Sequence, residues 1–475
     1  MAPGAATMIG PGSDILGRLR VLRRPDGDHT MATAVSSTKR AATSGHDDGR
    51  TRARRALEAL NFFMADMQAG IGPFLGVFLQ QRGWQAGPIG TVMTAGGVAG
   101  MLFTAPAGAF IDHTKKKKLV VVVTGIATVL ASFLILWSQA WAVVTVSQVA
   151  TAIAGAAIGP AVAGMTLGVV RQKGFNAQNG RNQAFNHAGN MIGAGLSGWL
   201  GWQFGMPAIF YLSAAFGVLA ILSVLAIPEK AIDHQAARGL EQGEDSDDDG
   251  EPGKAEGFKV LIRNKPMLIL ALALACFHLG NGGMLPLYTL AVVGAGKGNP
   301  AVFTATTVVV AQAVMIVVSL IAMKVAAGRG YWLVLLISFA ALPARGLLAG
   351  SFIEHWGVWP VQALDGIGAG LQSVAVPGLV ACLLKGTGRV NVGQGAVMTV
   401  QGVGASLSPA IGGWIAQELG YRATFFILGG FAIASLALWI GFAATLRPAC
   451  AGTDGGGQGD EDGAGADRGS KEGAR

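Results

Sequence analysis

The sequence has few charged side chains and few cysteines. Asp, Glu, Lys and Arg make up 13% of its 475 residues, whereas soluble domains carry about 25%. Hydrophobic residues make up 51%. The three cysteines, Cys276, Cys382 and Cys450, cannot form a disulfide framework. This composition excludes an ordinary soluble domain and indicates a chain that lies in a lipid bilayer.

Signatures of several other functions are also missing. The chain has no Gly-x-x-x-x-Gly-Lys-Ser/Thr sequence, so ATP hydrolysis is not expected. No pairing of a nucleophile with a base is evident in the apolar segments, which argues against an enzyme. The net charge of +8 comes from basic residues between long apolar runs, without a basic face interleaved with aromatics, so we expect no nucleic-acid partner. We expect no cofactor and no metal site.

Long apolar segments dominate what is present. A helix needs about 20 mostly apolar residues to cross the hydrocarbon core of a bilayer. Twelve segments meet this requirement, and they predict an all-α membrane protein with twelve transmembrane helices in two six-helix bundles. The segments are 57–80, 87–111, 118–138, 141–169, 183–204, 207–227, 266–291, 302–326, 331–350, 357–384, 394–416 and 423–446.

Polar segments divide this series into parts. The arm before the first apolar segment lacks a signal-peptide core, and Met31 is an alternative start to Met1. The arm, the acidic stretch after the sixth segment and the C-terminal tail bury too little apolar surface to fold, so we expect them to be disordered. The predicted parts are an arm (1–55), a first bundle (56–228), an acidic linker (229–265), a second bundle (266–446) and a tail (447–475).

Basic residues predict the orientation of the chain. Cytoplasmic joints of membrane proteins are enriched in Lys and Arg. If the N-terminus is cytoplasmic, only Arg82, Lys297 and Arg422 fall in outer joints, and nearly all other basic residues fall in inner segments. Both termini are therefore expected in the cytoplasm.

The two predicted bundles repeat each other in sequence. Gly198-Trp199-Leu200 recurs as Gly413-Trp414-Ile415. At nearly the same offset, Asp66 corresponds to Asn281 and Gln148 to Gln362. Duplicated halves are typical of transporters, whose substrate path lies between the repeats.

A motif follows the second apolar segment. Gly108 stands four residues before Asp112, and a basic run with Lys116 and Lys117 comes next. The motif resembles that of the major facilitator superfamily over about residues 56–446, although His113 and Lys115 replace the usual Arg and second Gly. The resemblance implies two pseudo-symmetric bundles, alternating access and a cytoplasmic gating role for Gly108, Asp112, Lys116 and Lys117. An acid at this edge can cap or pair with a neighbouring helix end.

A second motif lies in the eleventh apolar segment. Gly404, Pro409, Gly412 and Gly413 are similar to a pattern of the bacterial drug/proton antiporters of this superfamily. Small residues of this kind favour close helix packing. The fifth segment has Ala194 where those antiporters carry the proline, and Thr151 stands near their fourth-segment arginine.

Ionisable residues within apolar segments are costly and require a reason. Asp66 lies near the middle of the first segment, where it could carry a proton or be a silent, hydrogen-bonded carboxyl. His278 and Asn281 occupy the corresponding seventh segment, and a histidine could either titrate or only donate a hydrogen bond. In the fifth segment, a polar face is formed by Gln183, Asn186, His187 and Asn190. This face could line an inner cavity or bind another helix.

Arg345 and Asp365 reach similar depths in the ninth and tenth segments. Pairing would offset the cost of two unpaired charges, so we expect an intramembrane ion pair. Alternatively, Asp365 binds substrate or protons directly.

These features predict a secondary active transporter that acts as a monomer in a bacterial inner membrane. Its partners would be a small organic solute and protons, and the antiporter resemblance favours efflux. The alternatives are a facilitator or importer of a sugar or organic acid, or a membrane sensor on the same fold.

Overall fold

The computed structural model describes residues 49–67, 71–233, 235–238, 262–385 and 389–450. Residues 1–48 of the expected arm (1–55), the acidic stretch of the linker and residues 451–475 of the expected tail (447–475) lie outside the described residues. The elements below belong to the unit Arg50–Arg475. In the described part of the chain every regular element is helical, which agrees with the predicted all-α class.

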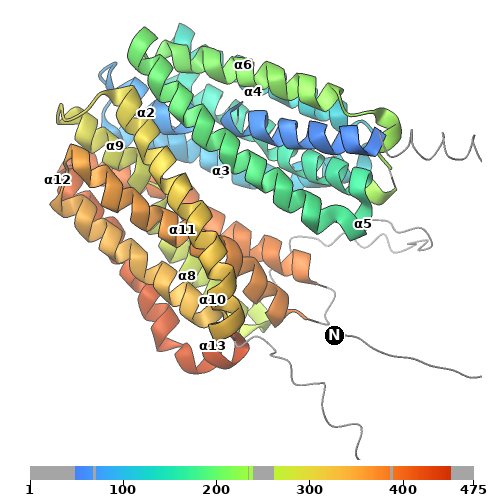
Figure 1. Ribbon diagram of the computed structural model, residues 1–475. Helices are drawn as coiled ribbons and strands as arrows, with labels where there is room; N and C mark the ends of the chain where they lie inside the picture. The colour runs from blue at the N-terminus through green and yellow to red at the C-terminus, as the bar shows by residue number, and fades with distance from the viewer. Residues whose placement is uncertain (1–48, 68–70, 234, 239–261, 386–388, 451–475) are drawn as a thin grey trace, which may run out of the picture. The chain divides into compact units, whose positions relative to one another are not determined.

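The helices follow one another with short joints (Figure 1). Residues 49–67 form an unlabelled helix. The labelled helices of the first half are α2 (Ile71–Gln80), α3 (Ala86–His113), α4 (Lys117–Trp137), α5 (Trp141–Phe204) and α6 (Pro207–Leu225). The short 3-10 helices η1 (Glu229–Ala231) and η2 (Ala236–Arg238) follow. The second half has α8 (Lys265–Asn281), α9 (Met284–Gly294), α10 (Pro300–Ser351), η3 (His355–Gly357), α11 (Val358–Leu383), α12 (Val390–Gly441) and α13 (Ala443–Cys450).

Twelve spans result from these helices. Nine stretches in the described residues are long and apolar enough to cross a membrane. Three of them, α5, α10 and α12, lose helical backbone geometry once, at Arg171, Gly330 and Gly420. Each of these three therefore contains two spans. The twelve predicted transmembrane helices are confirmed.

Several predicted boundaries differ from the structure. Residues 49–55 of the predicted disordered arm (1–55) and residues 447–450 of the predicted tail (447–475) are helical. The stretch 170–182 was expected to be a joint because it is polar, yet it is helical except at Arg171. The predicted seventh segment is interrupted at Gly282 and Gly283, between α8 and α9. Polar side chains at a helix end occur both in helices and in joints, and so do glycines within an apolar run. Hydropathy alone therefore places these boundaries poorly.

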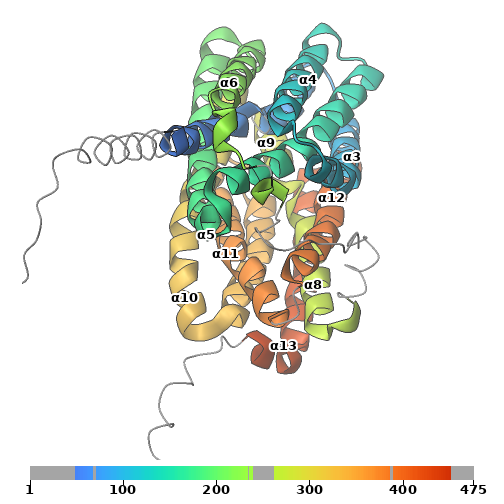
Figure 2. The ribbon, with the colours of Figure 1, turned by 90° about the vertical axis from the view of Figure 1, so that its right-hand side faces the viewer.

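The joints lie at two opposite ends of the spans. We call one the Trp84 end, formed by the joints 81–85, 138–140, 205–206, 295–299 and 352–357 and by Gly420. The other is the Lys116 end, formed by 114–116, Arg171, 226–233, Gly330 and 384–385. Within the halves, α4 packs on α6 and α8 packs on α12 (Figures 1 and 2).

The two halves contact each other mainly through α3 with α12, α5 with α10 and α2 with α9, and α2 also contacts α10. Among the described residues, four hydrogen bonds join the halves, all toward the Trp84 end. In two of them, Gln80 Nε2 donates to Leu290 O at 3.1 Å and Trp414 Nε1 donates to Thr91 Oγ1 at 3.1 Å. The other two are from Gly87 N to Gln417 Oε1 and from Ala410 N to Thr94 Oγ1.

Glycines permit this close approach. A Cβ atom on Gly90 would overlap the carbonyl oxygen of Pro409, and one on Gly413 would overlap that of Ala86. Within the second half, a Cβ on Gly404 would overlap the carbonyl oxygen of Ala275. Small residues at these crossings let the helix backbones touch. Close packing of this kind is expected in a bilayer, where the hydrophobic effect does not drive helices together.

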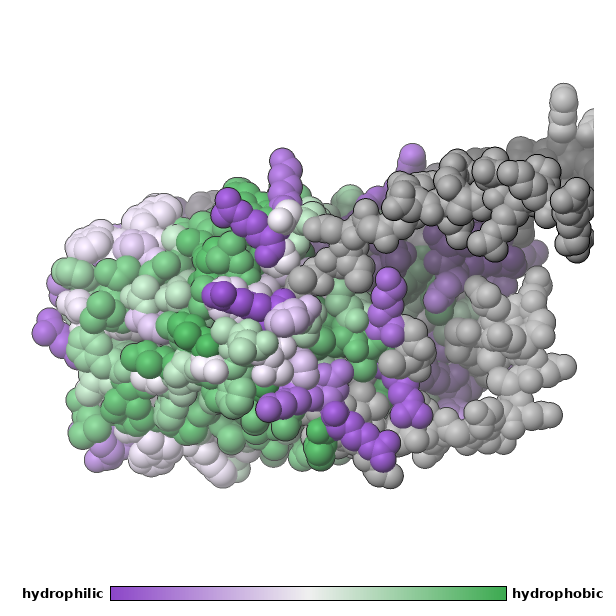
Figure 3. Space-filling model, turned by 90° about the horizontal axis from the view of Figure 1, so that it is seen from below, coloured by the Kyte–Doolittle hydropathy of each residue, from purple (hydrophilic) through white to green (hydrophobic). Residues whose placement is uncertain are grey.

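Apolar side chains cover much of the outer surface. Large hydrophobic residues such as Leu130, Trp137 and Val317 are more than half exposed. Figure 3 shows hydrophobic residues spread over one face, with hydrophilic residues gathered toward one side of it. A soluble protein rarely exposes so much apolar surface, so this face fits contact with lipid.

Gly420 provides a test of the helix break in α12. Its φ of +84° and ψ of 162° belong to a region that is nearly restricted to glycine. We expect Gly420→Ala to destabilise the protein by about 1–3 kcal/mol, measured as a lower melting temperature in detergent. Gly430→Ala is the matched control, because that glycine is helical in the same element and has open space around it. Equal melting temperatures of the two variants would contradict this prediction.

Candidate functional site

A polar cluster surrounds Arg345 in the second half. Arg345 is 0% exposed, and its Nη1 donates to Asp365 Oδ1 at 2.8 Å and to Asn281 Oδ1. Its Nη2 donates to Gln362 Oε1 at 3.0 Å. Asn281 Nδ2 also donates to Asp365 Oδ1, at 3.1 Å. The cluster is neutral overall and links α8, α10 and α11, although Arg345 Nε and Gln362 Nε2 have no partner in the described residues.

His278 belongs to a second network, one helical turn from Asn281. Its Nε2 lies 3.2 Å from Gln372 Oε1, and Gln372 Nε2 donates to Ser338 Oγ at 3.0 Å. Ser338 Oγ donates onward to the carbonyl oxygen of Gly368. The network links α8, α11 and α10, so His278 contributes at least to cohesion within the second half.

Asp66 lies in a different environment in the first half. It is 1% exposed, and neither carboxylate oxygen has a hydrogen-bond partner in the described part of the chain. Its side chain packs on Gly193 of α5, where a Cβ atom would overlap Oδ1. Ser213 of α6 reaches only the backbone carbonyl of Asp66. The carboxyl group is therefore buried between helices without compensation.

The side chains of the predicted polar face of α5 have two kinds of environment. Asn190 Nδ2 donates to Asn186 Oδ1, and Asn186 Nδ2 donates to the carbonyl oxygen of Asn61 in the helix 49–67. Gln183 is exposed, and His187 Nδ1 is buried without a partner in the described residues. This face therefore both binds the first helix and presents polar atoms beside it.

Sequence reasoning missed a neighbouring network nearer the Lys116 end. Gln178 Nε2 donates to Glu58 Oε1 at 3.2 Å and to Asn182 Oδ1 at 3.0 Å. Asn182 Nδ2 donates to Thr166 Oγ1, and Arg181 Nε lies 3.6 Å from Glu58 Oε1. The signal was the spacing of four residues between Gln178 and Asn182, which puts both on one helix face.

The residues of the motif from Gly108 to Lys117, at the Lys116 end, differ in their burial. Gly108 has open space around it, and Asp112 and Lys116 are exposed. Lys117 is 3% exposed, and its ammonium donates to the carbonyl oxygens of Ile111 and Thr114. A cation at the C-terminal end of α3 is electrostatically favourable, so Lys117 fastens the turn between α3 and α4.

Asp233 fastens the chain after α6 to the same end. Its carboxylate lies 3.0 Å from Arg171 Nη2, and its backbone N–H donates to Gly168 O. Partial burial alone would raise the pKa of Asp233, but hydrogen bonds from the N–H groups of Ala236 and Gln235 and the charge of Arg171 outweigh it and lower the pKa below its ordinary value. Arg171 itself has a φ of 56°, which is unusual for a residue with a side chain.

The chain has two repeated helical halves that touch toward one end, and it buries ionisable groups between its spans. These features are typical of polytopic membrane transporters. Among the described residues, no group of three His, Cys, Asp or Glu side chains could hold a metal ion.

Comparisons with known proteins identify the family. The Major Facilitator Superfamily matches residues 58–391. An uncharacterized MFS-type transporter of Mycobacterium tuberculosis is 37% identical over 396 residues, covering 82% of this chain and 92% of that protein, with the same values in strains CDC 1551 / Oshkosh and H37Rv. The chain therefore belongs to the major facilitator superfamily and is an integral membrane transporter.

Solved structures agree with this fold. A mutant of the nucleoside transporter NupG matches with a TM-score of 0.71 at 12% identity, covering 82% of this chain and 99% of that one. A bacterial homolog of the human lysosomal transporter Spinster, inward-facing and unoccupied, matches with a TM-score of 0.61 at 14% identity, covering 85% and 97%.

The Arg345 cluster predicts a strong double-mutant coupling. Replacing one member of a buried pair leaves a charge without compensation and costs about 3–5 kcal/mol. We expect Arg345→Met and Asp365→Leu each to lower the melting temperature in detergent sharply, and the double variant to lose less than the two losses together. Arg422→Met, an exposed arginine at the Trp84 end, is the control and should have little effect. Additive losses would show that the two side chains do not act as a pair.

Asp233 predicts a pH dependence. Because its pKa is lower in the folded than in the unfolded chain, its ionised form stabilises the fold above the unfolded pKa of about 3.9. That contribution disappears as the pH falls through the lower folded-state pKa. The melting temperature of the wild type should therefore exceed that of Asp233→Asn at neutral pH, and the difference should shrink below about pH 4. A difference that stays constant with pH would exclude this linkage.

Proposed function

We propose that this transporter exports a small organic solute in exchange for protons by alternating access. In this proposal the bundles 56–228 and 266–446 rock against each other, the linker 229–265 and both termini are cytoplasmic, and the monomer is the working unit in a bacterial inner membrane. Export is favoured by the resemblance of Gly404, Pro409, Gly412 and Gly413 to drug/proton antiporters.

The charge distribution supports the orientation. The Lys116 end carries Lys115, Lys118, Arg171, Arg329 and Lys385 among others, whereas Arg82, Lys297 and Arg422 lie at the Trp84 end. Because basic joints are retained in the cytoplasm, the Lys116 end is taken as cytoplasmic. The hydrogen bonds between the halves lie toward the other end, which corresponds to a conformation open to the cytoplasm.

Asp66 carries the proposal of proton coupling. A charged carboxylate without a partner in a low-dielectric interior costs several kcal/mol. A protonated carboxyl avoids that cost, and a deprotonated one requires water or a cation beside it. Rearrangement of the halves would change the access of water to this site, so uptake and release of a proton at Asp66 would be coupled to the transport cycle.

The Arg345 cluster has a different role in this proposal. Asp365 already binds a cation, Arg345, and Asn281 completes the pair. A proton on Asp365 would break this neutral arrangement and leave the guanidinium uncompensated. We therefore assign the Arg345–Asp365 pair to holding the second half together, and we assign His278 to the supporting network through Gln372.

Asp66→Asn tests the coupling directly. The variant keeps the size of the side chain and removes the proton, so we expect it to lose solute flux driven by an imposed pH gradient in proteoliposomes, by at least about tenfold. Exchange of labelled for unlabelled solute without a gradient should persist, because the path remains intact. Glu418→Gln, an exposed acid near the Trp84 end, is the matched control and should retain gradient-driven flux.

The result has two informative alternatives. Undiminished gradient-driven flux in Asp66→Asn would remove Asp66 from the coupling mechanism. Flux in the wild type that ignores the pH gradient would indicate a facilitator instead of an exchanger.

A further inference from the structure

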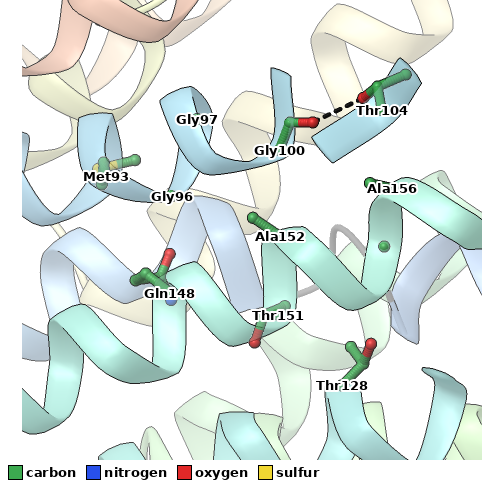
Figure 4. Close-up of a pocket in the computed structure, with 11 residues that line it drawn as sticks. Met93, Gly96, Gly97, Gly100, Thr104, Thr128, Gln148, Thr151, Ala152 and Ala156 are labelled. Atoms are coloured by element: carbon green, nitrogen blue, oxygen red, sulfur yellow. Dashed lines mark hydrogen bonds between the residues drawn. The ribbon is translucent and has the colours of Figure 1, made fainter. Parts of the chain in front are cut away.

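A cavity of about 450 Å³ lies among spans of the first half. Its lining comes from α3, α4 and α5 (Figure 4). Part of the wall on α3 is glycine, at Gly96, Gly97 and Gly100, and the facing part of α5 carries Ala152 and Ala156. The polar lining consists of Thr104, Thr128, Gln148 and Thr151. A cavity of this size accommodates a small organic molecule.

The repeat explains why space is left here. Gln148 in the first half corresponds to Gln362 in the second, and Thr151 and Asp365 each stand three residues later. Seventeen residues before each glutamine stand Ala131 and Arg345. In the second half these positions hold the Arg345–Asp365 pair, with Gln362 bound to the guanidinium. The first half has the same framework without the arginine and the acid.

Helix packing also leaves more space in the first half than in the second. In the second half, Gly366 of α11 lies against Val314 of α10, and Gly370 lies against Val318. In the first half, a Cβ atom added to Gly100 of α3 would meet only Ala152, with its methyl group at 3.6 Å and its carbonyl oxygen at 3.8 Å, both ordinary contact distances. On α3 the first half has Gly100 where the second half has Val314 on α10, so the space that a valine fills in the second half is left open in the first.

The polar groups of the cavity are only partly used. Thr104 and Thr128 each donate to a carbonyl of their own helix, at Gly100 and Thr124, so their oxygens remain acceptors toward the cavity. Thr151 Oγ1 is buried and has no hydrogen-bond partner in the described part of the chain. A buried hydroxyl without a partner costs free energy that a bound ligand can recover.

The eleven lining residues include no side chain that is charged at neutral pH. A charged ligand would therefore lose its hydration without meeting a counter-charge. Hydroxyl groups suit the site, because they can donate to the threonine oxygens and accept from Thr151 and Gln148. The apolar remainder of the wall suits a carbon skeleton.

We propose that this cavity is the solute-recognition subsite of the first half, and that it takes an uncharged, hydroxyl-bearing part of the solute. This inference rests on the proposed transport function and adds the chemical class of the cargo. The depth is compatible with coupling, because Met67, which follows Asp66, packs on Gly125 one helical turn from Thr128. The subsite and the carboxyl group then lie on neighbouring helices of one half.

The test uses the full chain in proteoliposomes and in detergent. The probes are D-glucose, glycerol and uridine as neutral hydroxylated compounds, with glucosamine and gluconate as charged analogues. We expect at least one neutral probe to be transported or to raise the melting temperature, and the charged analogues to act more weakly. If no neutral probe does either, or if the charged analogues act equally, the inference is wrong.

Thr151→Val tests the contribution of the Thr151 hydroxyl group to solute binding. It should raise the KM for the neutral probe by roughly fivefold or more, as expected for one lost hydrogen bond. It should leave the melting temperature of the ligand-free protein unchanged or higher, because an unpartnered polar group is removed. Thr145→Val is the matched control on α5, where the hydroxyl is bound to Trp141 O outside the cavity. An unchanged KM in Thr151→Val overturns the inference.

A double variant, Ala131→Arg with Thr151→Asp, copies the second-half pair into the first half. It should occupy the cavity and abolish the effect of the neutral probe, and an undiminished effect in the folded variant would overturn the inference.

The experiments distinguish a failure of this inference from a failure of the transport proposal. If Thr151→Val raises the KM but flux does not depend on the pH gradient, proton coupling is refuted and the subsite is retained. If the pH gradient drives flux but Thr151→Val leaves the KM unchanged, the subsite is refuted and proton coupling is retained.

Discussion

A charge buried among transmembrane helices needs protein groups or enclosed water to compensate it, and Arg345 meets this constraint by binding three side chains at once. Asp365, Asn281 and Gln362 come from two other helices, so the contacts that compensate the guanidinium also fix α8, α10 and α11 relative to one another. The cost of breaking such a pair is larger than that of most apolar substitutions. The second half is thereby built around one neutral cluster that resists rearrangement.

The first half is built on the same repeat without that cluster. Asn281, which binds Arg345, is matched by Asp66, which has no partner in the described residues. Asp365 is matched by Thr151, whose hydroxyl is also unpartnered there. Polar groups at equivalent positions are thus bonded within the second half and left available in the first. This difference is the basis of our proposal that the second half is the support and that the first half contacts the proton and the solute.

Hydropathy was sufficient to predict the twelve spans, because a membrane requires long apolar helices with every backbone group bonded internally. The Arg345–Asp365 contact followed from depth, since two charges in neighbouring spans have few other partners. The cavity at Thr151 could not be predicted. It depends on which small side chains face each other across α3 and α5, and that requires the rotation of each helix. In the sequence, Gln362 indicates only the repeat, and its hydrogen bond to Arg345 depends on the same rotation.

The contacts between the halves are of a strength that transport can reverse. In the described part of the chain, four hydrogen bonds join them toward the Trp84 end, and each contributes about 0.5–1.5 kcal/mol net. Their sum, roughly 2–6 kcal/mol, is close to the differential binding that shifts a two-state equilibrium from one side to the other, about 5.5 kcal/mol. Glycine crossings such as Gly90 against Pro409 add contact without interlocking side chains. In the proposed transport cycle, a proton and a solute bound in the first half would supply free energy of this order to separate this end, and the Arg345 cluster would stay intact.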